Sequence, residues 1–348
     1  MKKKIPVGIL GATGSVGQMF VNLLEDHPFF EINDLCASER SHSKKYSEAV
    51  NWIIPKPLSE KIGNMVVKPC EPNINSRIVF SGLDSKVAGE IESNFAKNGY
   101  IVISNSKNHR MFENVPLLIP DVNPDHLDLI KHQKYGKGLI ITNPNCSTIG
   151  LCMALKPIID EFGLDSVNVV TMQAISGAGY PGVASLDIID NVIPFIKDEE
   201  EKMELEPLKI LGKINNNKID FAEFKISAQC NRVAVINGHT ECVSIKTIRK
   251  TTKEEIISVW KKYTSIPQQL NLPFAPKKPI HYFEKENYPQ PRIHRNVENG
   301  MAVSIGRLRE CPIFDYKFVI LSHNTIRGAA GCAILNAELL ITKYKNLI

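Results

Sequence analysis

Apolar residues in the first 145 positions occur as short continuous runs, separated by stretches with the three-to-four-residue periodicity of helices. Such runs, without alternation, are typical of strands buried on both faces of a sheet. Strands interleaved with helices predict a parallel sheet with crossover helices. The predicted strands are 5–10, 31–37, 77–81, 100–104 and 138–142.

The pattern changes in the middle of the chain, where extended, β-branched runs have few helices between them. Such runs favour a mostly antiparallel sheet and therefore a second domain. The polar, proline-containing stretch Pro267–Tyr288 predicts surface loops or an interface arm, and a last helical pattern begins at Gly328. The predicted strands are 166–174, 232–248, 301–305 and 314–321.

Composition limits the function classes. The chain has 348 residues, 43% hydrophobic and 23% charged, as in soluble globular proteins. A formal charge of +5 with one lysine cluster, Lys2–Lys4, suits small anionic substrates better than nucleic acid. No run reaches the about 20 apolar residues of a membrane-spanning helix, and the apolar run after the lysines is too short for a signal-peptide core. We therefore expect a cytoplasmic protein with neither a membrane nor a nucleic-acid partner.

The eight cysteines form no C-x-x-C pair, and no histidine cluster has metal-ligand spacing. This pattern predicts reduced thiols in a cytosolic protein and no bound metal. Cys152, Cys242 and Cys332 lie within apolar helical or strand patterns, so they are candidates for the core.

The segment GATGSVG lies between the first predicted strand and a helical pattern. Its glycines permit a tight turn in which backbone N–H groups approach a pyrophosphate at a helix N-terminus. A purely structural turn would use the same letters, so it is the placement between strand and helix that predicts a dinucleotide site. The expected contacts are Gly11, Thr13, Gly14, Ser15 and Val16.

The residues after the second strand distinguish the two nicotinamide dinucleotides. Ser38, Arg40 and Ser41 favour a 2′-phosphate, because a guanidinium can bind it with two hydrogen bonds. Glu39 instead resembles the acidic residue that binds the ribose hydroxyl of NAD. We expect NADP, with Glu39 pointing to solvent.

Cys146 lies in NPNCST, after the strand at 138–142 and before an apolar helical pattern. The dipole and N–H groups of a helix N-terminus stabilise a thiolate, and we expect the same N–H groups to bind an oxyanion. Thiols are common in cores, but Cys146 has polar neighbours on both sides. It is predicted to attack an acyl carbon that exchanges a hydride with the nicotinamide.

A proton-transferring group must accompany such a nucleophile, and histidine is the side chain best suited near neutral pH. Among nine histidines, His239 lies in NGHT, a glycine-containing kink inside the long run 232–248. A lone strand histidine is more often structural, so the spacing alone leaves its role open.

Five segments in this order, spread over nearly the whole chain, resemble the aspartate-semialdehyde dehydrogenases, particularly their archaeal and fungal branch. Other acyl-phosphate reductases share the nucleotide segment GATGSVG, whereas NPNCST and RVAVINGHT are highly specific. The five are GATGSVG, NPNCST, QAISGAGYPG, RVAVINGHT and NTIRGAAG.

With the strand pattern, this resemblance implies an α/β protein. A Rossmann-type dinucleotide-binding domain would occupy 1–145 and be completed by the helix at 328–348. An α+β catalytic and dimerisation domain with a mostly antiparallel sheet would occupy 146–327. The implied activity is NADPH-dependent reductive dephosphorylation of 4-aspartyl phosphate to aspartate 4-semialdehyde, in aspartate-family amino-acid biosynthesis. The implied assembly is a homodimer or homotetramer.

The resemblance also implies a role for each matching position. Cys146 would form the acyl thioester, His239 would be the general acid/base, and Gln173 would orient the substrate or the histidine. The implied substrate contacts are Arg232 with the carboxylate, Glu206 with the amine, and Lys209, Arg110 and Asn145 with the phosphate. The implied nicotinamide contacts are Ser176, Gly177, Gly179 and Asn324.

Two alternatives remain open. An acyl-CoA reductase, such as a malonyl-CoA reductase, would share the fold and the thiolate, but its substrate has no amine for Glu206. A non-catalytic binding protein would be expected to lack Cys146 or His239, and both are present. A second E-x-x-K pair, Glu199 and Lys202, fits an i,i+3 ion pair on a solvated helix face better than a substrate contact.

Overall fold

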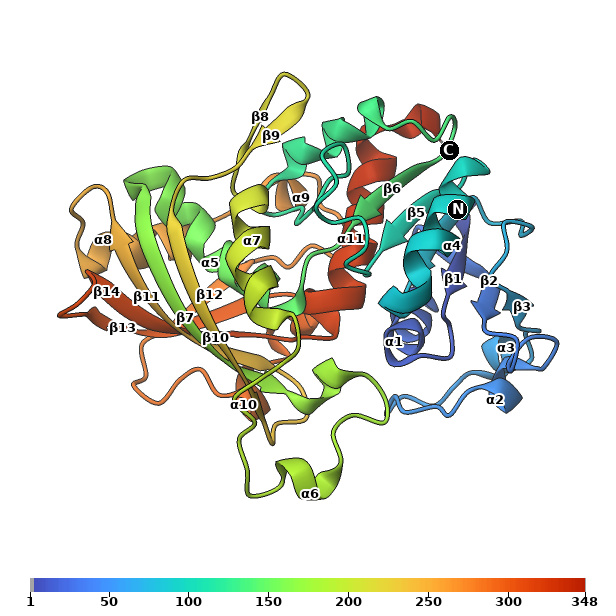
Figure 1. Cartoon of the computed structure of the whole chain (residues 1–348), viewed down its shortest axis with the longest axis horizontal. Coiled ribbons are helices and arrows are strands. Elements are labelled where there is room, and N and C mark those ends of the chain that lie inside the picture. Colours follow the sequence, from blue (N-terminus) through green and yellow to red (C-terminus); the bar gives the residue numbers. More distant parts are fainter. Residues whose placement is uncertain (1–2, 348) are drawn as a thin grey trace. The chain divides into compact units, whose positions relative to one another are not determined.

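The computed structural model describes residues 3–347, which divide into two compact units (Figure 1). Unit 1 contains the chain up to Leu118, Asp125–Asn143 and the segment from Ala329 onward. Unit 2 contains Ile119–Pro124 and Pro144–Gly328. Among the described residues, none of the helices has the length and apolar character that a membrane crossing requires.

Unit 1 is built on a parallel six-stranded sheet in the order β3-β2-β1-β4-β5-β6, the order of dinucleotide-binding Rossmann folds. The five strands predicted for this part of the chain are confirmed, each within one residue at either end. The two-residue strand β3 is too short to leave a sequence pattern. The strands are β1 (Ile5–Leu10), β2 (Phe30–Ala37), β3 (Lys68–Pro69), β4 (Ile78–Ser81), β5 (Ile101–Ser104) and β6 (Leu139–Thr142).

The helices of unit 1 include the last long helix of the chain, α11 (Gly331–Lys343), which packs against β5. Its buried Glu338 lies 2.7 Å from Nε2 of His27, also buried, and this contact joins the C-terminal helix to the segment before β2. The helix predicted from Gly328 begins three residues later, after a π-helical turn at Ile326–Ala330. The other helices are α1 (Ser15–Leu24), α2 (Tyr46–Ala49), α3 (Glu60–Gly63), α4 (Ser85–Lys97), and 3₁₀ turns at Pro124–His132 and Lys345–Leu347.

Unit 2 contains a mixed six-stranded sheet in the order β10-β7-β11-β14-β13-β12. Three of its five strand pairs are antiparallel and the two outer pairs are parallel. The large-sheet strands are β7 (Leu164–Ala174), β10 (Lys225–Val233), β11 (His239–Thr247), β12 (Ile280–Phe283), β13 (Val303–Glu310) and β14 (Tyr316–Ser322). A separate hairpin is formed by β8 (Lys213–Asn215) and β9 (Lys218–Asp220).

The helices α5 (Cys146–Phe162) and α8 (Lys253–Lys262) pack against this sheet, and α7 (Glu199–Ile210) packs against its edge strand β10 (Figure 1). Glu200 and Glu204 of α7 accept hydrogen bonds from the N–H groups of Cys230 and Ala228, each at 3.0 Å. Carboxylates of α7 thus cover an otherwise open strand edge. The short helices are α6 (Ser185–Ile188), α9 (Ile266–Gln269), α10 (Pro291–His294) and 3₁₀ turns at Ile175–Ala178 and Val297–Gly300.

Two predictions for unit 2 are wrong. The run 232–248 is not one kinked strand. Its first two residues end β10 and residues 239–247 form β11, and these two strands pair with opposite edges of β7. The stretch Pro267–Tyr288 is not wholly loop, since it contains most of α9 and the whole of β12.

Cys242, predicted as a core residue, is exposed. The strand alternation of β11 instead turns its neighbour Glu241 inward, where the carboxyl is fully buried and has no hydrogen-bond partner among the described residues. Burial raises the pKa of Glu241 well above its usual value, which favours the neutral acid.

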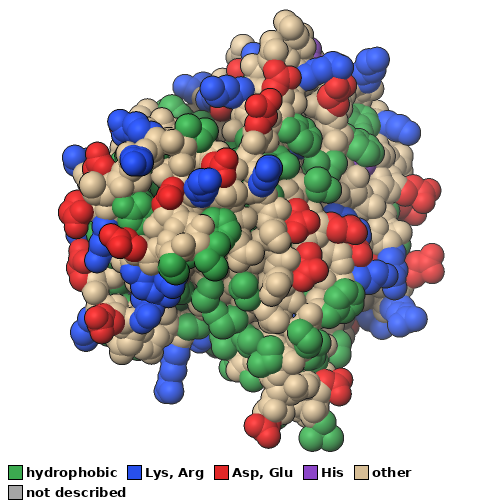
Figure 2. Space-filling view, turned by 60° about the vertical axis from the view of Figure 1, so that its left-hand side comes forward, with side chains coloured by type: hydrophobic (Ala, Val, Ile, Leu, Met, Phe, Trp, Pro, Cys, Tyr) green, Lys and Arg blue, Asp and Glu red, His purple; other side chains and the backbone are tan. Residues whose placement is uncertain are grey.

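The surface of unit 2 exposes apolar side chains along the segment around α6. Figure 2 shows apolar side chains gathered at the lower end of the face drawn, while Lys, Arg, Asp and Glu are interspersed above. Large exposed apolar residues of this segment are Tyr180, Leu186, Ile189, Val192 and Phe195.

Candidate active site

The glycine-rich turn of unit 1 has the close packing that a nucleotide turn requires. Gly11, directly after β1, has φ +76°, a conformation that favours glycine. A Cβ on Gly17 would lie 2.1 Å from the carbonyl oxygen of Gly11, so α1 approaches β1 this closely only with glycine. Gly14 is the N-cap residue of α1, and in the described structure no side chain forms a capping hydrogen bond with this helix start. The N-terminus of α1 is therefore suited to bind an anion. The remaining predicted contacts, Thr13, Ser15 and Val16, lie in the same turn and the first turn of α1.

The residues predicted at the 2′-phosphate follow β2, the strand next to β1. Ser38, Glu39 and Arg40 are exposed, and the N–H of Ser41 donates to the carbonyl of Ser38 at 2.9 Å. The turn therefore presents a serine and an arginine at the carboxyl end of the sheet, where ligands of this fold bind.

In unit 2, Cys146 is the first residue of α5, as the sequence predicted. The preceding residue, Asn145, caps the helix: its Oδ1 accepts from the N–H groups of Ser147 and Thr148 at 2.9 and 3.2 Å. These two N–H groups are therefore occupied by the cap, so the expected oxyanion donors at this helix start do not include them.

The strand register places four polar residues in one row on the helix-covered face of the sheet. Arg232 on β10 pairs with Gln173 on β7, and His239 on β11 pairs with Ser322 on β14. Thr240 pairs with Met172, so His239 follows Gln173 in the same row. All four are buried. Residues more than 140 positions apart in the chain thus meet at one end of the sheet.

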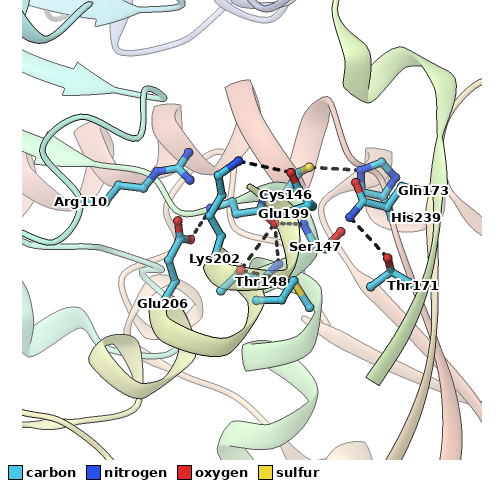
Figure 3. Close-up of polar contacts among 12 residues, drawn as sticks. Arg110, Cys146, Ser147, Thr148, Thr171, Gln173, Glu199, Lys202, Glu206 and His239 are labelled. Carbon is cyan, nitrogen blue, oxygen red and sulfur yellow. Dashed lines mark hydrogen bonds and ion pairs between the residues drawn. The ribbon is translucent and has the colours of Figure 1, made fainter. Parts of the chain in front are cut away.

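His239 is the centre of this row. Its Nε2 lies 3.1 Å from Sγ of Cys146, and its Nδ1 accepts from the N–H of Ala174 at 3.0 Å (Figure 3). Full burial, with the positive charge of Arg232 and the ring of His323, lowers the pKa of His239 to about 3. The imidazole is therefore neutral where it contacts the sulfur.

The other row members have defined partners. Nη1 of Arg232 donates to the carbonyl of Ala174 at 2.7 Å. Nε2 of Gln173 donates to the hydroxyl of Thr171 at 3.4 Å (Figure 3). Both contacts hold the side chains along β7, beside His239.

Loops predicted to contact nicotinamide lie against the same histidine. A Cβ on Gly177 would lie 2.9 Å from Nη1 of Arg232 and 3.2 Å from Cε1 of His239, so only glycine fits without displacement. Asn324 accepts from the N–H of Gly238 and donates to the hydroxyl of Ser176, both at 2.8 Å. The fourth predicted contact, Gly179, has φ +76° and ends the turn.

Helix α7 brings Glu206 and Lys209 to unit 2's buried interior. Oε2 of Glu206 accepts from the backbone N–H of Asn145 at 2.7 Å, so this carboxylate lies next to the start of α5. Lys209 is 1% exposed, and desolvation lowers its pKa to about 8 even though the nearby Glu206 acts in the opposite direction.

Glu199 corrects another expectation. It forms the predicted i,i+3 ion pair with Lys202 at 3.3 Å, but it does not lie on a solvated face. It is buried and accepts a hydrogen bond from Nδ2 of Asn145 (Figure 3). The E-x-x-K spacing of Glu199 and Lys202 predicted the ion pair, but it gave no sign of the contact between Glu199 and Asn145.

Arg110 lies in unit 1, buried, and its Nη2 donates to the carbonyl of Asn105 at 2.8 Å. Sequence reasoning missed Gly328, whose backbone packs on Cys146: a Cβ there would lie 2.8 Å from Cβ of the cysteine. It also missed the N–H of Ala174, which no side-chain pattern could reveal.

A Rossmann unit, joined in one chain to a unit with a cysteine–histidine pair at a helix start, is the architecture of a nucleotide-dependent dehydrogenase with a cysteine nucleophile. Two family models agree: residues 6–130 match the semialdehyde dehydrogenase NAD-binding domain, and residues 155–327 match the semialdehyde dehydrogenase dimerisation domain.

Curated relatives identify the branch. The chain is 50% identical to aspartate-semialdehyde dehydrogenase of Archaeoglobus fulgidus, over 96% of this chain and 97% of the relative. It is 51% identical to the enzyme of Schizosaccharomyces pombe, over 97% and 98%. A crystal structure of the Candida albicans enzyme with NADP has a TM-score of 0.91 and 44% identity, over 99% of this chain and 100% of that one. The chain belongs to the aspartate-semialdehyde dehydrogenase family, and the predicted archaeal and fungal resemblance is confirmed.

Proposed function

We propose that this chain catalyses the NADPH-dependent reductive dephosphorylation of 4-aspartyl phosphate to aspartate 4-semialdehyde and phosphate, in aspartate-family amino-acid biosynthesis. The observation that carries the proposal is the 3.1 Å contact between Cys146 Sγ, at a helix start, and His239 Nε2. In this reading Cys146 attacks the acyl carbon and forms a thioester. Bound NADPH supplies the hydride that reduces this carbon.

The charges around the pair match the substrate, which carries a carboxylate, an ammonium and a phosphate. Arg232 would bind the carboxylate, since a guanidinium suits it with two parallel hydrogen bonds. Glu206 would bind the ammonium, and Lys209, Arg110 and Asn145 the phosphate. Glu206 is the reason to prefer this substrate to a malonyl thioester, which has no amine.

Unit 1 would be the NADP-binding domain. The turn at Gly11–Gly17 fits the group, because its glycine-only packing and an α1 start without a side-chain cap leave backbone N–H groups for a pyrophosphate. Ser38, Arg40 and Ser41 would bind the 2′-phosphate, and Ser176, Gly177, Gly179 and Asn324 the nicotinamide half.

Unit 2 would be the catalytic and oligomerisation domain. A homodimer or homotetramer in the cytoplasm, with no nucleic-acid or membrane partner, is part of the same proposal. The match of residues 155–327 to a dimerisation domain supports self-association.

The proposal is tested by following NADPH formation from aspartate 4-semialdehyde and NADP, with and without phosphate. Wild type should require phosphate, and Cys146→Ser should be nearly inactive. Cys242→Ser, which changes an exposed thiol of the same unit, is the matched control and should keep wild-type activity. Activity with malonyl-CoA and NADPH, in a protein inactive with the semialdehyde, would contradict the substrate assignment.

A further inference from the structure

Glu92, on α4 of unit 1, is a buried carboxyl that has no part in the proposed reaction so far. Its Oε1 accepts a hydrogen bond from the hydroxyl of Ser104, the last residue of β5, at 2.8 Å. The same hydroxyl oxygen accepts from the backbone N–H of Ser106 at 3.0 Å. The carboxyl is therefore tied to the turn that follows β5.

Arg110 is joined to this turn through the same peptide group. The N–H of Ser106 and the carbonyl of Asn105 belong to one planar trans peptide unit, so they point in opposite directions. That carbonyl accepts from Nη2 of Arg110 at 2.8 Å. A continuous chain of hydrogen bonds thus runs from the guanidinium, through one peptide group and one hydroxyl, to Glu92.

Burial gives each link of this chain weight. The side chains of Glu92, Ser104, Ser106 and Arg110 are all buried. Away from water, neighbouring hydrogen bonds in a chain polarise one another, and a broken link leaves a buried polar group unpaired. Loss of either end should therefore be felt along the whole chain.

The other groups around the carboxyl do not replace the chain. Burial raises the pKa of Glu92 to about 7, while the hydroxyls of Ser81 and Ser104 and the charge of Arg110 act in the opposite direction. Nε2 of His109 lies 3.6 Å from Oε2 of Glu92, which is longer than a hydrogen bond. Burial lowers the pKa of His109, so this ring is neutral at neutral pH and brings no charge to the carboxyl.

We propose that Glu92 is a positioning residue for Arg110 and that, through this chain, it holds the guanidinium in the orientation that binds phosphate. The inference rests on the proposed function, which assigns Arg110 to the phosphate. Glu92 touches neither substrate nor cofactor in this scheme. A displaced guanidinium would weaken phosphate binding, so the KM for phosphate is the quantity that should respond.

Two variants break the chain at different links. Ser104→Ala removes the hydroxyl, and Glu92→Met removes the carboxyl oxygen that accepts from it. In the phosphate-dependent assay each should raise the KM for phosphate about tenfold, the equivalent of one hydrogen bond to a charged group, and leave kcat and the KM for NADP within about threefold. The double variant should have the same KM for phosphate as the single ones, because all three lose the same chain. If Glu92→Met does not fold, Ser104→Ala, which removes a single oxygen, decides.

Two further variants separate positioning from a general loss of packing. Glu92→Gln keeps an acceptor oxygen for Ser104 and should retain the wild-type KM for phosphate. Ser81→Ala is the matched control: Ser81 ends β4, pairs with Ser104 in register and faces the same carboxyl, but the chain does not pass through it. An unchanged KM in Ser104→Ala and Glu92→Met, or an equal rise in Ser81→Ala, would overturn the proposal.

Amide hydrogen exchange of segment 104–110, measured by mass spectrometry without substrate, reports on the chain itself. Exchange should be slow in wild type, Glu92→Gln and Ser81→Ala, and faster in the two variants that break the chain. If exchange changes in this way but wild type has no phosphate-dependent activity, the function alone is refuted. If wild type requires phosphate but neither exchange nor KM changes in the variants, the positioning role alone is refuted.

Discussion

Replacement of Asn145 separates two roles of one side chain. Its Oδ1 caps α5 through the N–H groups of Ser147 and Thr148, and its Nδ2 donates to the buried Glu199. Asn145→Ala removes both. Loss of an N-cap costs about 1 kcal/mol. Oε1 of the buried Glu199 loses its donor, while Oε2 keeps Lys202, and an unsatisfied buried acceptor costs about 1–3 kcal/mol. The alanine variant should therefore lose about 2–4 kcal/mol of unfolding free energy.

Asn145→Ser is the matched control, because a serine oxygen still caps the helix but no longer reaches Glu199. It should be about 1 kcal/mol more stable than Asn145→Ala. Urea unfolding followed by Trp260 fluorescence, in a Trp52→Phe background, measures this. Trp260 is buried and its Nε1 donates to the carbonyl of Ala154 in α5 at 2.9 Å, so it reports on this helix. An alanine variant within about 0.5 kcal/mol of wild type would refute the reasoning.

Three further predictions concern other parts of the chain. Gly17→Ala should destabilise the protein by about 1–3 kcal/mol or more, because the new Cβ would lie 2.1 Å from the carbonyl oxygen of Gly11. Gly14→Ala should cost far less, since its Cβ would lie 3.4 Å from the same oxygen. Thermal unfolding of the two variants compares these costs. Burial raises the pKa of Glu92 from 4.5 to about 7, so the unfolding free energy should fall by up to about 3 kcal/mol as pH rises from about 4.5 through 7. Urea unfolding midpoints measured against pH should show this decrease in wild type and lose it in Glu92→Gln. The same decrease in the variant would contradict the assignment. Lys209→Met should raise the KM for phosphate about 10–100-fold, which corresponds to the loss of one hydrogen bond to a charged group. Lys202→Met is the control and should change this KM by no more than a few-fold. Equal effects of the two substitutions would argue against the Lys209 assignment.

Unit 1 could be predicted well because its signals are local. Strands buried on both faces are continuous apolar runs, and each is recognisable without knowledge of its neighbours. The turn at Gly11–Gly17 is likewise local, since Gly17 is required by contacts with Gly11 and Ala12 of the same turn. Cys146 at the start of α5 belongs to this class, because Asn145 and the following residues carry the helix signal themselves.

Unit 2 could not be predicted to the same depth, because its side-chain environments depend on strand pairing. Asn237 and Gly238 mark a kink within 232–248, but only the pairing of β10 and β11 with opposite edges of β7 shows that they are different strands. The inward side of β11 carries Glu241 and the outward side Cys242, the reverse of what residue polarity suggests.

The sequence by itself determined five of the six strands of unit 1's sheet, the glycine-rich turn, the position of Cys146 at a helix start and the family. Only the tertiary structure decided which residues surround the sulfur. His239 meets Cys146 because strand register and helix packing bring them together across 93 residues. The N–H of Ala174, the last residue of β7, donates to Nδ1 of His239 across 65 residues. A backbone hydrogen bond between distant segments leaves no mark on residue type, since every residue except proline offers the same N–H.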